Sequence, residues 1–228
     1  GPPRQQNSGT LDSTRSGGPP LPTSPRLTST ETPFVMSTFE YVMVLVSIVI
    51  GLALTHVLTA IAAGVHRLRG HGKPLVLDPV YLLWVGNVTL WLVSFWWVEY
   101  TFREVQDWTF GLYLFVISFA IVLFLLASIL VPHRLEGVED TYDYFMRGRR
   151  WFFGTYLIGV TFDVVDTLLK GTDYAAAPTA HWHAGVFLAV GLTGMVSSRR
   201  VVQLVAACTG SVLPLLYMFQ QLGVIQAQ

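Results

Sequence analysis

Two aspartates within an apolar stretch are the residues of this sequence best suited to chemistry. Asp163 and Asp166 are three residues apart, so a helix places both carboxylates on one face. Each ionisable group deep in a membrane costs about 2.5 to 3.5 kcal/mol on insertion scales and therefore needs a reason. Two close carboxylates predict a shared proton or a bound cation. The structural alternative pairs Asp166 with Lys170, four residues on, and gives Asp163 an internal polar contact.

Further ionisable residues fall at the same expected depth. Glu99, Glu40 and the pair His181 and His183 could join Asp163 in one cluster. Carboxylates and imidazoles ligate zinc, iron or manganese, and histidine also accepts protons near neutral pH. The His-Trp-His spacing matches no established metal signature, so the sequence leaves metals and cofactors undetermined. The structural alternative for Glu99 is a pair with Arg103.

A second polar position lies in the opposite half of the expected helices. His56 and Asn87 fall at similar depths on consecutive apolar segments, which predicts a hydrogen bond between two packed helices. Ligation of a haem by His56 is the alternative, and His133 is the nearest second histidine. Tryptophans on the segment that carries Asn87 could pack against a ring cofactor or lipid; they are Trp84, Trp91, Trp96 and Trp97.

The composition places these residues in a membrane. Of 228 residues only 12% are charged while 52% are hydrophobic, and the mean hydropathy is +0.52. A soluble protein carries about 25% charged residues. The net charge of zero, without a basic stripe, excludes a nucleic-acid binder. The single cysteine, Cys208, excludes an intrachain disulfide and a multi-cysteine metal site.

The apolar residues are gathered into blocks about as long as the roughly 20 helical residues that cross a bilayer. We expect an all-α, multi-pass bundle of six transmembrane helices, at residues 39–65, 79–102, 109–131, 150–169, 183–197 and 201–224. The fifth is short, so the fifth and sixth are either two helices or one broken element. We expect residues 132–149 to form a solvated amphipathic segment that ends in arginines.

Two parts of the chain differ in composition. Residues 1–35 are rich in Pro, Ser, Thr and Gly, which predicts a disordered tail. Residues 36–228 form a single transmembrane domain. The run from Met36 to Tyr41, with the apolar helix after it, is similar to the start of small bacterial multi-pass proteins. That resemblance implies a prokaryotic cytoplasmic membrane and carries no function.

Basic residues predict the threading. The first, third and fifth connections hold nine Lys and Arg residues, whereas the second and fourth hold Arg103 and Lys170. Because cytoplasmic loops collect Lys and Arg, both termini are expected outside. Two halves of three helices would then be inserted in opposite senses, as in inverted-repeat transporters. Small residues at four-residue spacing on the first and fifth helices, from Gly51 and Gly185 onward, agree with close helix packing.

These patterns favour transport or sensing of a small solute or proton through a polar site in the outer half. A membrane-embedded redox or metal-binding component and a non-catalytic scaffold subunit are the alternatives. The lipid bilayer is the one partner that the composition requires. A small solute or cation and a second copy of the chain remain open as further partners.

Overall fold

The chain folds into helices throughout its described domain. The computed structural model describes residues 1, 37–70, 73–105, 107–171 and 178–225, so the expected tail at 1–35 lies almost entirely outside the described residues. Within these ranges there are six α-helices and one short 3-10 helix: α1 (Thr38–Leu68), α2 (Pro79–Glu99), η1 (Tyr100–Glu104), α3 (Phe110–Leu130), α4 (Thr141–Leu169), α6 (Pro178–Val196) and α7 (Arg200–Ile225). The prediction of an all-helical fold is confirmed for this part of the chain.

Four of the helices are long and apolar enough to cross a membrane, namely α1, α2, α3 and α4. The described apolar stretches of α6 and α7 are shorter, at Trp182–Val196 and Arg200–Leu216. Large apolar side chains are exposed on the helix surfaces, as lipid contact requires; examples are Ile48, Val93 and Ile158. These features are consistent with the helical membrane protein that the sequence predicts.

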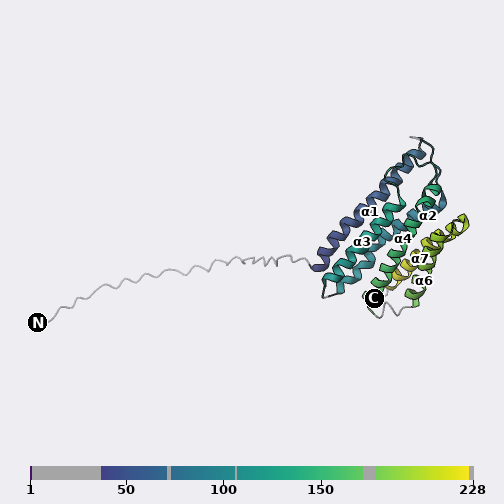
Figure 1. The fold of residues 1–228 in the computed structure, drawn as a ribbon. Coiled ribbons are helices and arrows are strands. Elements are labelled where there is room, and N and C mark those ends of the chain that lie inside the picture. The colour runs from purple at the N-terminus through teal and green to yellow at the C-terminus, as the bar shows by residue number, and fades with distance from the viewer. Residues whose placement is uncertain (2–36, 71–72, 106, 172–177, 226–228) are drawn as a thin grey trace, which may run out of the picture. The chain divides into compact units, whose positions relative to one another are not determined.

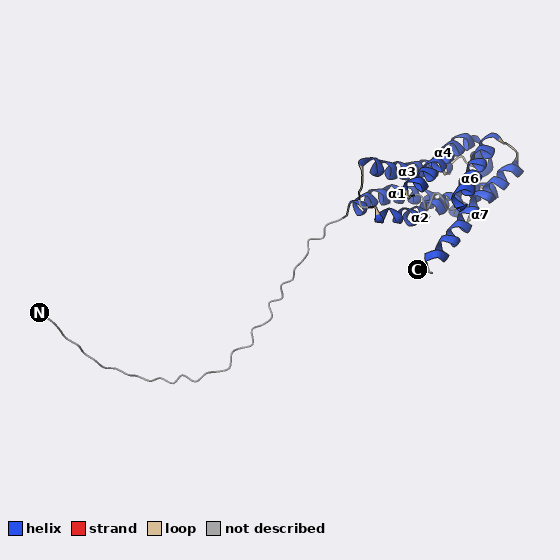
Figure 2. Cartoon of the chain, turned by 90° about the horizontal axis from the view of Figure 1, so that it is seen from below, coloured by secondary structure: helices blue, strands red, loops and turns tan. Residues whose placement is uncertain are grey.

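Helix α2 occupies the centre of the bundle and contacts α1, α3, α4 and α7. Helix α1 packs mainly on α3, while α4 packs on both α3 and α6. In two perpendicular views α6 and α7 lie on the far side of the bundle from α1 (Figure 1 and Figure 2). The central position of α2 explains its fully buried side chains, which include Val80, Trp84 and Val88.

Polar side chains fix where the helices begin. Ser37 accepts a hydrogen bond from the Glu40 amide in a capping box at the start of α1. Asp78 accepts from the Val80 amide, and Pro79 occupies the first turn of α2. Asp140 accepts from the amides of Tyr142 and Asp143 at the start of α4.

The cap at Asp140 corrects one expectation. We expected a solvated segment at 132–149 and a helix from residue 150, but α4 begins at Thr141. Phe145, within the supposed segment, is buried in the core beside Phe152. The first turns of α4 carry charged residues on one face, while the other face packs into the bundle.

The fifth and sixth apolar segments are two separate helices. The chain leaves α6 after Val196 and enters α7 at Arg200. The side-chain amide of Gln203, fully buried, donates to the carbonyls of Gly194 and Ser197 at 2.8 and 2.7 Å. Gln203 therefore satisfies carbonyls that the end of α6 leaves without helical partners.

The small-residue stripes do not mediate close packing within the chain. Gly51, Thr55, Thr59 and Ala63 are all exposed on α1, as are Gly185 and Ala189 on α6. Close approach instead depends on Gly191 and Gly194, where an added Cβ would overlap Leu157 and Phe153 of α4. In an inverted repeat α1 and α4 would be the equivalent first helices of the two halves. Yet α1 packs mainly on α3, the third helix of its half, whereas α4 packs mainly on α6, the second helix of its half. The repeat stays a prediction.

Substitution of Gly194 tests the α4–α6 contact. Gly194→Ala should destabilise the protein by about 1 to 3 kcal/mol, because the new methyl group overlaps the Phe153 ring. Gly185→Ala is the matched control, since nothing lies within 4 Å of its Cβ position. Thermal unfolding in detergent measures both variants. Equal melting temperatures would contradict the close contact.

Candidate functional site

Three of the predicted polar residues, Glu99, Asp163 and Asp166, lie together at one end of the bundle. Helices α2 and α4 begin side by side, where the Thr141 hydroxyl accepts a hydrogen bond from the Asp78 amide at 2.8 Å. They also end side by side, where Glu99 of α2 interacts electrostatically with Asp166 and Asp163 of α4. We call these the Asp78 end and the Glu99 end. Glu99, Asp163, Asp166 and Lys170 form the carboxylate cluster at the Glu99 end.

Asp166 and Lys170 form a buried ion pair one helical turn apart. Only 3% of the Asp166 side chain and 4% of the Lys170 side chain are exposed. The ammonium group also lies 5.0 Å from the centre of the Phe102 ring, a cation–π contact. Lys170 therefore turns into the bundle rather than marking an exposed border. The alternative in which Asp166 pairs with Lys170 is therefore correct for this contact.

Glu99 is fully buried at the last residue of α2. Among the described residues, neither oxygen of its carboxylate has a hydrogen-bond partner. The expected alternative partner, Arg103, instead donates to the Tyr100 hydroxyl and lies over the Tyr100 ring. The pairing of Glu99 with Arg103 is therefore wrong, and the nearest ammonium, that of Lys170, is already bonded to Asp166.

Asp163 lies one turn before Asp166 and is half-buried. It interacts electrostatically with Asp166, Lys170 and the phenol of Tyr156. Tyr156 is fully buried, and its hydroxyl has no hydrogen-bond partner in the described part of the chain. The cluster thus extends from the buried Glu99 toward a group with partial access to its surroundings.

An aromatic layer lies next to the cluster, toward the Asp78 end. The Trp91 ring stacks on Tyr156 with centroids 5.2 Å apart, and Phe187 of α6 packs on both. His183 contacts Phe187, with ring centroids 4.1 Å apart. The structure therefore joins His183 to this layer through Phe187. The His181 side chain lies outside the described residues.

Glu40, which we expected in the cluster, and the tryptophans of α2 lie outside it. Glu40 is exposed and completes the capping box of α1 through the Ser37 amide at 2.7 Å. Trp84 is buried among aromatic rings of α4, whereas Trp96 and Trp97 are 42% and 54% exposed. The tryptophans of α2 are thus divided between the core and the exposed helix surface.

His56 and Asn87 each bond a helix other than the one expected. His56 Nε2 donates to the Val131 carbonyl at the end of α3 at 3.0 Å. The Asn87 amide donates to the Gly210 carbonyl of α7. Both are interhelical polar contacts, but the predicted bond between the two residues is wrong, because similar depth says nothing of which way a side chain points around its helix.

The structure gives no support to the haem or metal alternative. The rings of His56 and His133 are in contact, with centroids 4.6 Å apart, which leaves no room for a porphyrin between them. Among the residues that the structure describes, no group of three or more His, Cys, Asp or Glu is arranged to hold a metal ion.

The comparisons with known proteins add no assignment. No family model, no curated protein and no solved structure matched this chain. The fold and the site define a class: a helical protein, with helices able to span a membrane, that buries a cluster of three carboxylates and one lysine.

A double-mutant cycle tests the buried ion pair. Asp166→Asn should destabilise the protein by about 3 to 5 kcal/mol, because it leaves the Lys170 charge buried without its partner. The double variant Asp166→Asn with Lys170→Met should recover much of that loss, since it removes both charges. Unfolding in detergent measures the cycle, with exposed Arg103→Met as the control. Additive effects of the two changes would contradict the pair.

Proposed function

We propose that this protein binds a proton at Glu99 and couples that binding to the transport or sensing of a small solute. One observation carries the proposal. Glu99 is fully buried, and neither carboxylate oxygen has a hydrogen-bond partner among the described residues. Single buried atoms of other described residues also lack a partner, among them Asn87 Oδ1 and Gln203 Oε1, but of the buried carboxyl groups of Asp78, Glu99 and Asp166 only that of Glu99 has neither oxygen bonded. Buried polar groups in native proteins almost always have partners, so a carboxyl group without any needs an explanation.

The charges around Glu99 favour a positive ligand. The cluster holds three carboxyl groups, of Glu99, Asp163 and Asp166, and one ammonium group, of Lys170. An unpaired buried charge is far costlier than a neutral polar group, so a bound proton offsets the excess carboxylate. Half-buried Asp163 gives such a ligand a polar contact on the way to Glu99.

The scaffold alternative has its own support. Asn87, Gln203 and His56 all bond backbone carbonyls at helix contacts or helix ends, as residues that only join helices would. A scaffold role leaves the unpartnered carboxylate of Glu99 unexplained. The redox or metal-binding alternative has no comparable observation in the described residues.

The threading belongs to the same proposal. Six spans, with α6 and α7 as the fifth and sixth, would place both termini and the second and fourth connections outside a prokaryotic cytoplasmic membrane. The support is the excess of Lys and Arg in the first, third and fifth connections. The Glu99 end would then face outward.

Transport in proteoliposomes tests the proposal. Wild-type protein under an imposed pH gradient should carry a proton flux, and Glu99→Gln should reduce it at least tenfold, because the amide keeps the shape and removes the ionisable group. Glu136→Gln is the matched control, since Glu136 is exposed near the Asp78 end. Equal flux in wild type and Glu99→Gln would contradict the role of Glu99. If the pH gradient is not dissipated, a gradient-dependent change in wild-type fluorescence that Glu99→Gln lacks would support the sensing form.

A further inference from the structure

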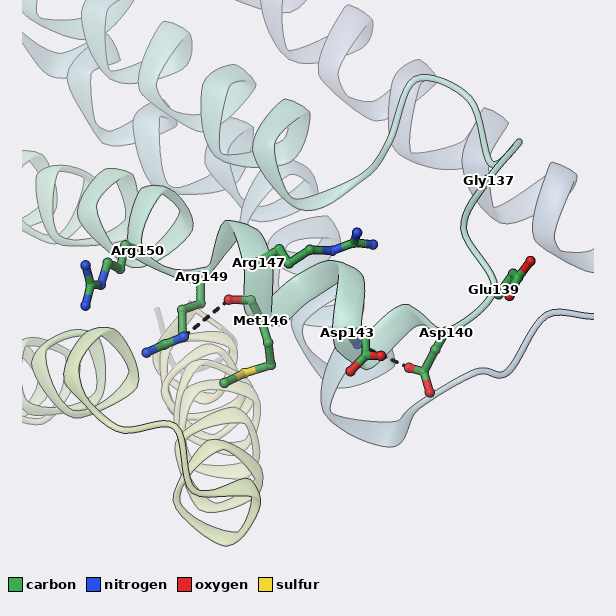
Figure 3. Close-up of a pocket in the computed structure, with 8 residues that line it drawn as sticks. All are labelled: Gly137, Glu139, Asp140, Asp143, Met146, Arg147, Arg149 and Arg150. Carbon is green, nitrogen blue, oxygen red and sulfur yellow. Dashed lines mark hydrogen bonds between the residues drawn. The ribbon is translucent and has the colours of Figure 1, made fainter.

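A cavity of about 840 Å³ opens at the Asp78 end, away from the carboxylate cluster. The first turns of α4 and the chain just before them line it (Figure 3). Its polar lining comprises Glu139, Asp140, Asp143, Arg147, Arg149 and Arg150. These residues appear in the sequence as loop charges, and only the early start of α4 brings them around one cavity.

The acidic and basic groups of the cavity do not neutralise one another. Across the described ranges, the ion pairs are Asp166 with Lys170 and Asp78 with Arg200, and neither involves a residue of the cavity lining. Asp140 caps α4, whereas Asp143 and Glu139 are exposed. The cavity therefore has a negative side, at the start of α4, and a positive side one to two turns further along.

Arg149 is held in place on the positive side. Its guanidinium donates to the Ser198 hydroxyl at 2.8 Å, in the connection between α6 and α7, and to the Met146 carbonyl at 3.3 Å. The remaining Nε is buried and has no partner within the described residues. In Figure 3 the Arg149 and Met146 side chains point toward α6 and α7. A guanidinium carries five N–H donors, so each terminal nitrogen of Arg149 keeps one N–H beyond these bonds, whereas the buried Nε is closed to an outside ligand.

Exposed apolar side chains place the cavity at a lipid border. Trp151 directly follows Arg150 and is 77% exposed. Val196 and Val201, on either side of the connection that carries Ser198, are 81% and 73% exposed. Tryptophan at the edge of an apolar span is typical of the headgroup level, and basic pockets between helices at that level bind lipid headgroups.

We propose that this cavity binds the headgroup of a zwitterionic aminophospholipid, one that carries both a phosphate and a primary ammonium group. The phosphate accepts hydrogen bonds from Arg149 and Arg150, because guanidinium groups match phosphate oxygens. The ammonium donates to the carboxylates of Asp143 and Glu139. A purely anionic headgroup would be repelled by these carboxylates, and a quaternary ammonium has no N–H to donate. The site does not depend on the role of Glu99.

Binding of defined lipids tests the proposal. Purified protein in detergent is titrated with short-chain phosphatidylethanolamine, phosphatidylcholine and phosphatidylglycerol, and the melting temperature gives an apparent affinity. Phosphatidylethanolamine should bind at least tenfold more tightly than the other two. Free phosphoethanolamine and inorganic phosphate should raise the melting temperature less, because they lack the acyl chains that the apolar border contacts.

Variants distinguish this site from general lipid binding. Asp143→Asn and Arg150→Gln should each weaken phosphatidylethanolamine binding at least tenfold. Asp107→Asn and Arg103→Gln are the matched controls, since both residues are exposed near the Glu99 end. If Arg150→Gln does not fold, the lipid retained by Asp143→Asn in native mass spectrometry decides. Stronger binding of phosphatidylglycerol, equal binding of free phosphoethanolamine, or an unchanged Asp143→Asn would overturn the proposal.

Discussion

The packing of α2 against four other helices is the constraint on which the rest of the structure depends. Every polar residue on its inner faces must find a partner inside the bundle, because neither water nor lipid reaches it. Asp78 meets this demand with Arg200 and the Val80 amide. Asn87 meets it in part, through its amide nitrogen and the Gly210 carbonyl, while Asn87 Oδ1 and Trp84 Nε1 have no partner among the described residues. Glu99, at the far end of the same helix, has no hydrogen-bond partner in the described structure. The carboxylate at the start of α2 is therefore paired, whereas the carboxylate at its end is not.

The Asp166–Lys170 pair keeps the nearby ammonium group from serving as a partner for Glu99. A lysine so close could neutralise Glu99, but its ammonium is bonded to Asp166 on its own helix and lies against the Phe102 ring. Breaking that pair to serve Glu99 would leave Asp166 unpaired. The cluster consequently keeps more carboxyl groups than ammonium groups in every arrangement of its own side chains. A mobile positive ligand resolves the imbalance without a change of fold.

Some of this arrangement could be predicted from the sequence. The pairing of Asp166 with Lys170 follows from their spacing on one helix, and the common depth of Glu99 and Asp163 follows from the lengths of two apolar segments. Contacts between helices could not be predicted in this way. Depth gives no rotation about a helix axis, so His56 and Asn87 were assigned to each other although each bonds a third helix.

The start of α4 at Thr141 was not predicted, because charged residues occupy its first turns. In the prediction of the threading, Arg147, Arg149 and Arg150 count as residues of a connection between helices. For that reason the helix that carries them is not predicted. Two features of the sequence could have predicted these turns of α4. Asp140 is a typical N-cap residue, and Phe145 and Phe152 after it are seven residues apart, which is two helical turns. With α4 extended to Thr141, the cavity between its acidic and basic turns follows.

Thermal unfolding of the wild type and of Glu99→Gln over a range of pH tests the central claim most directly. A group that binds protons differently in the folded and unfolded states makes stability depend on pH. If Glu99 is the ligand-binding carboxylate, the difference between the two melting temperatures should change by several degrees across the range. Two curves that run parallel at every pH would show that Glu99 binds protons equally in the folded and unfolded states, and would contradict the account.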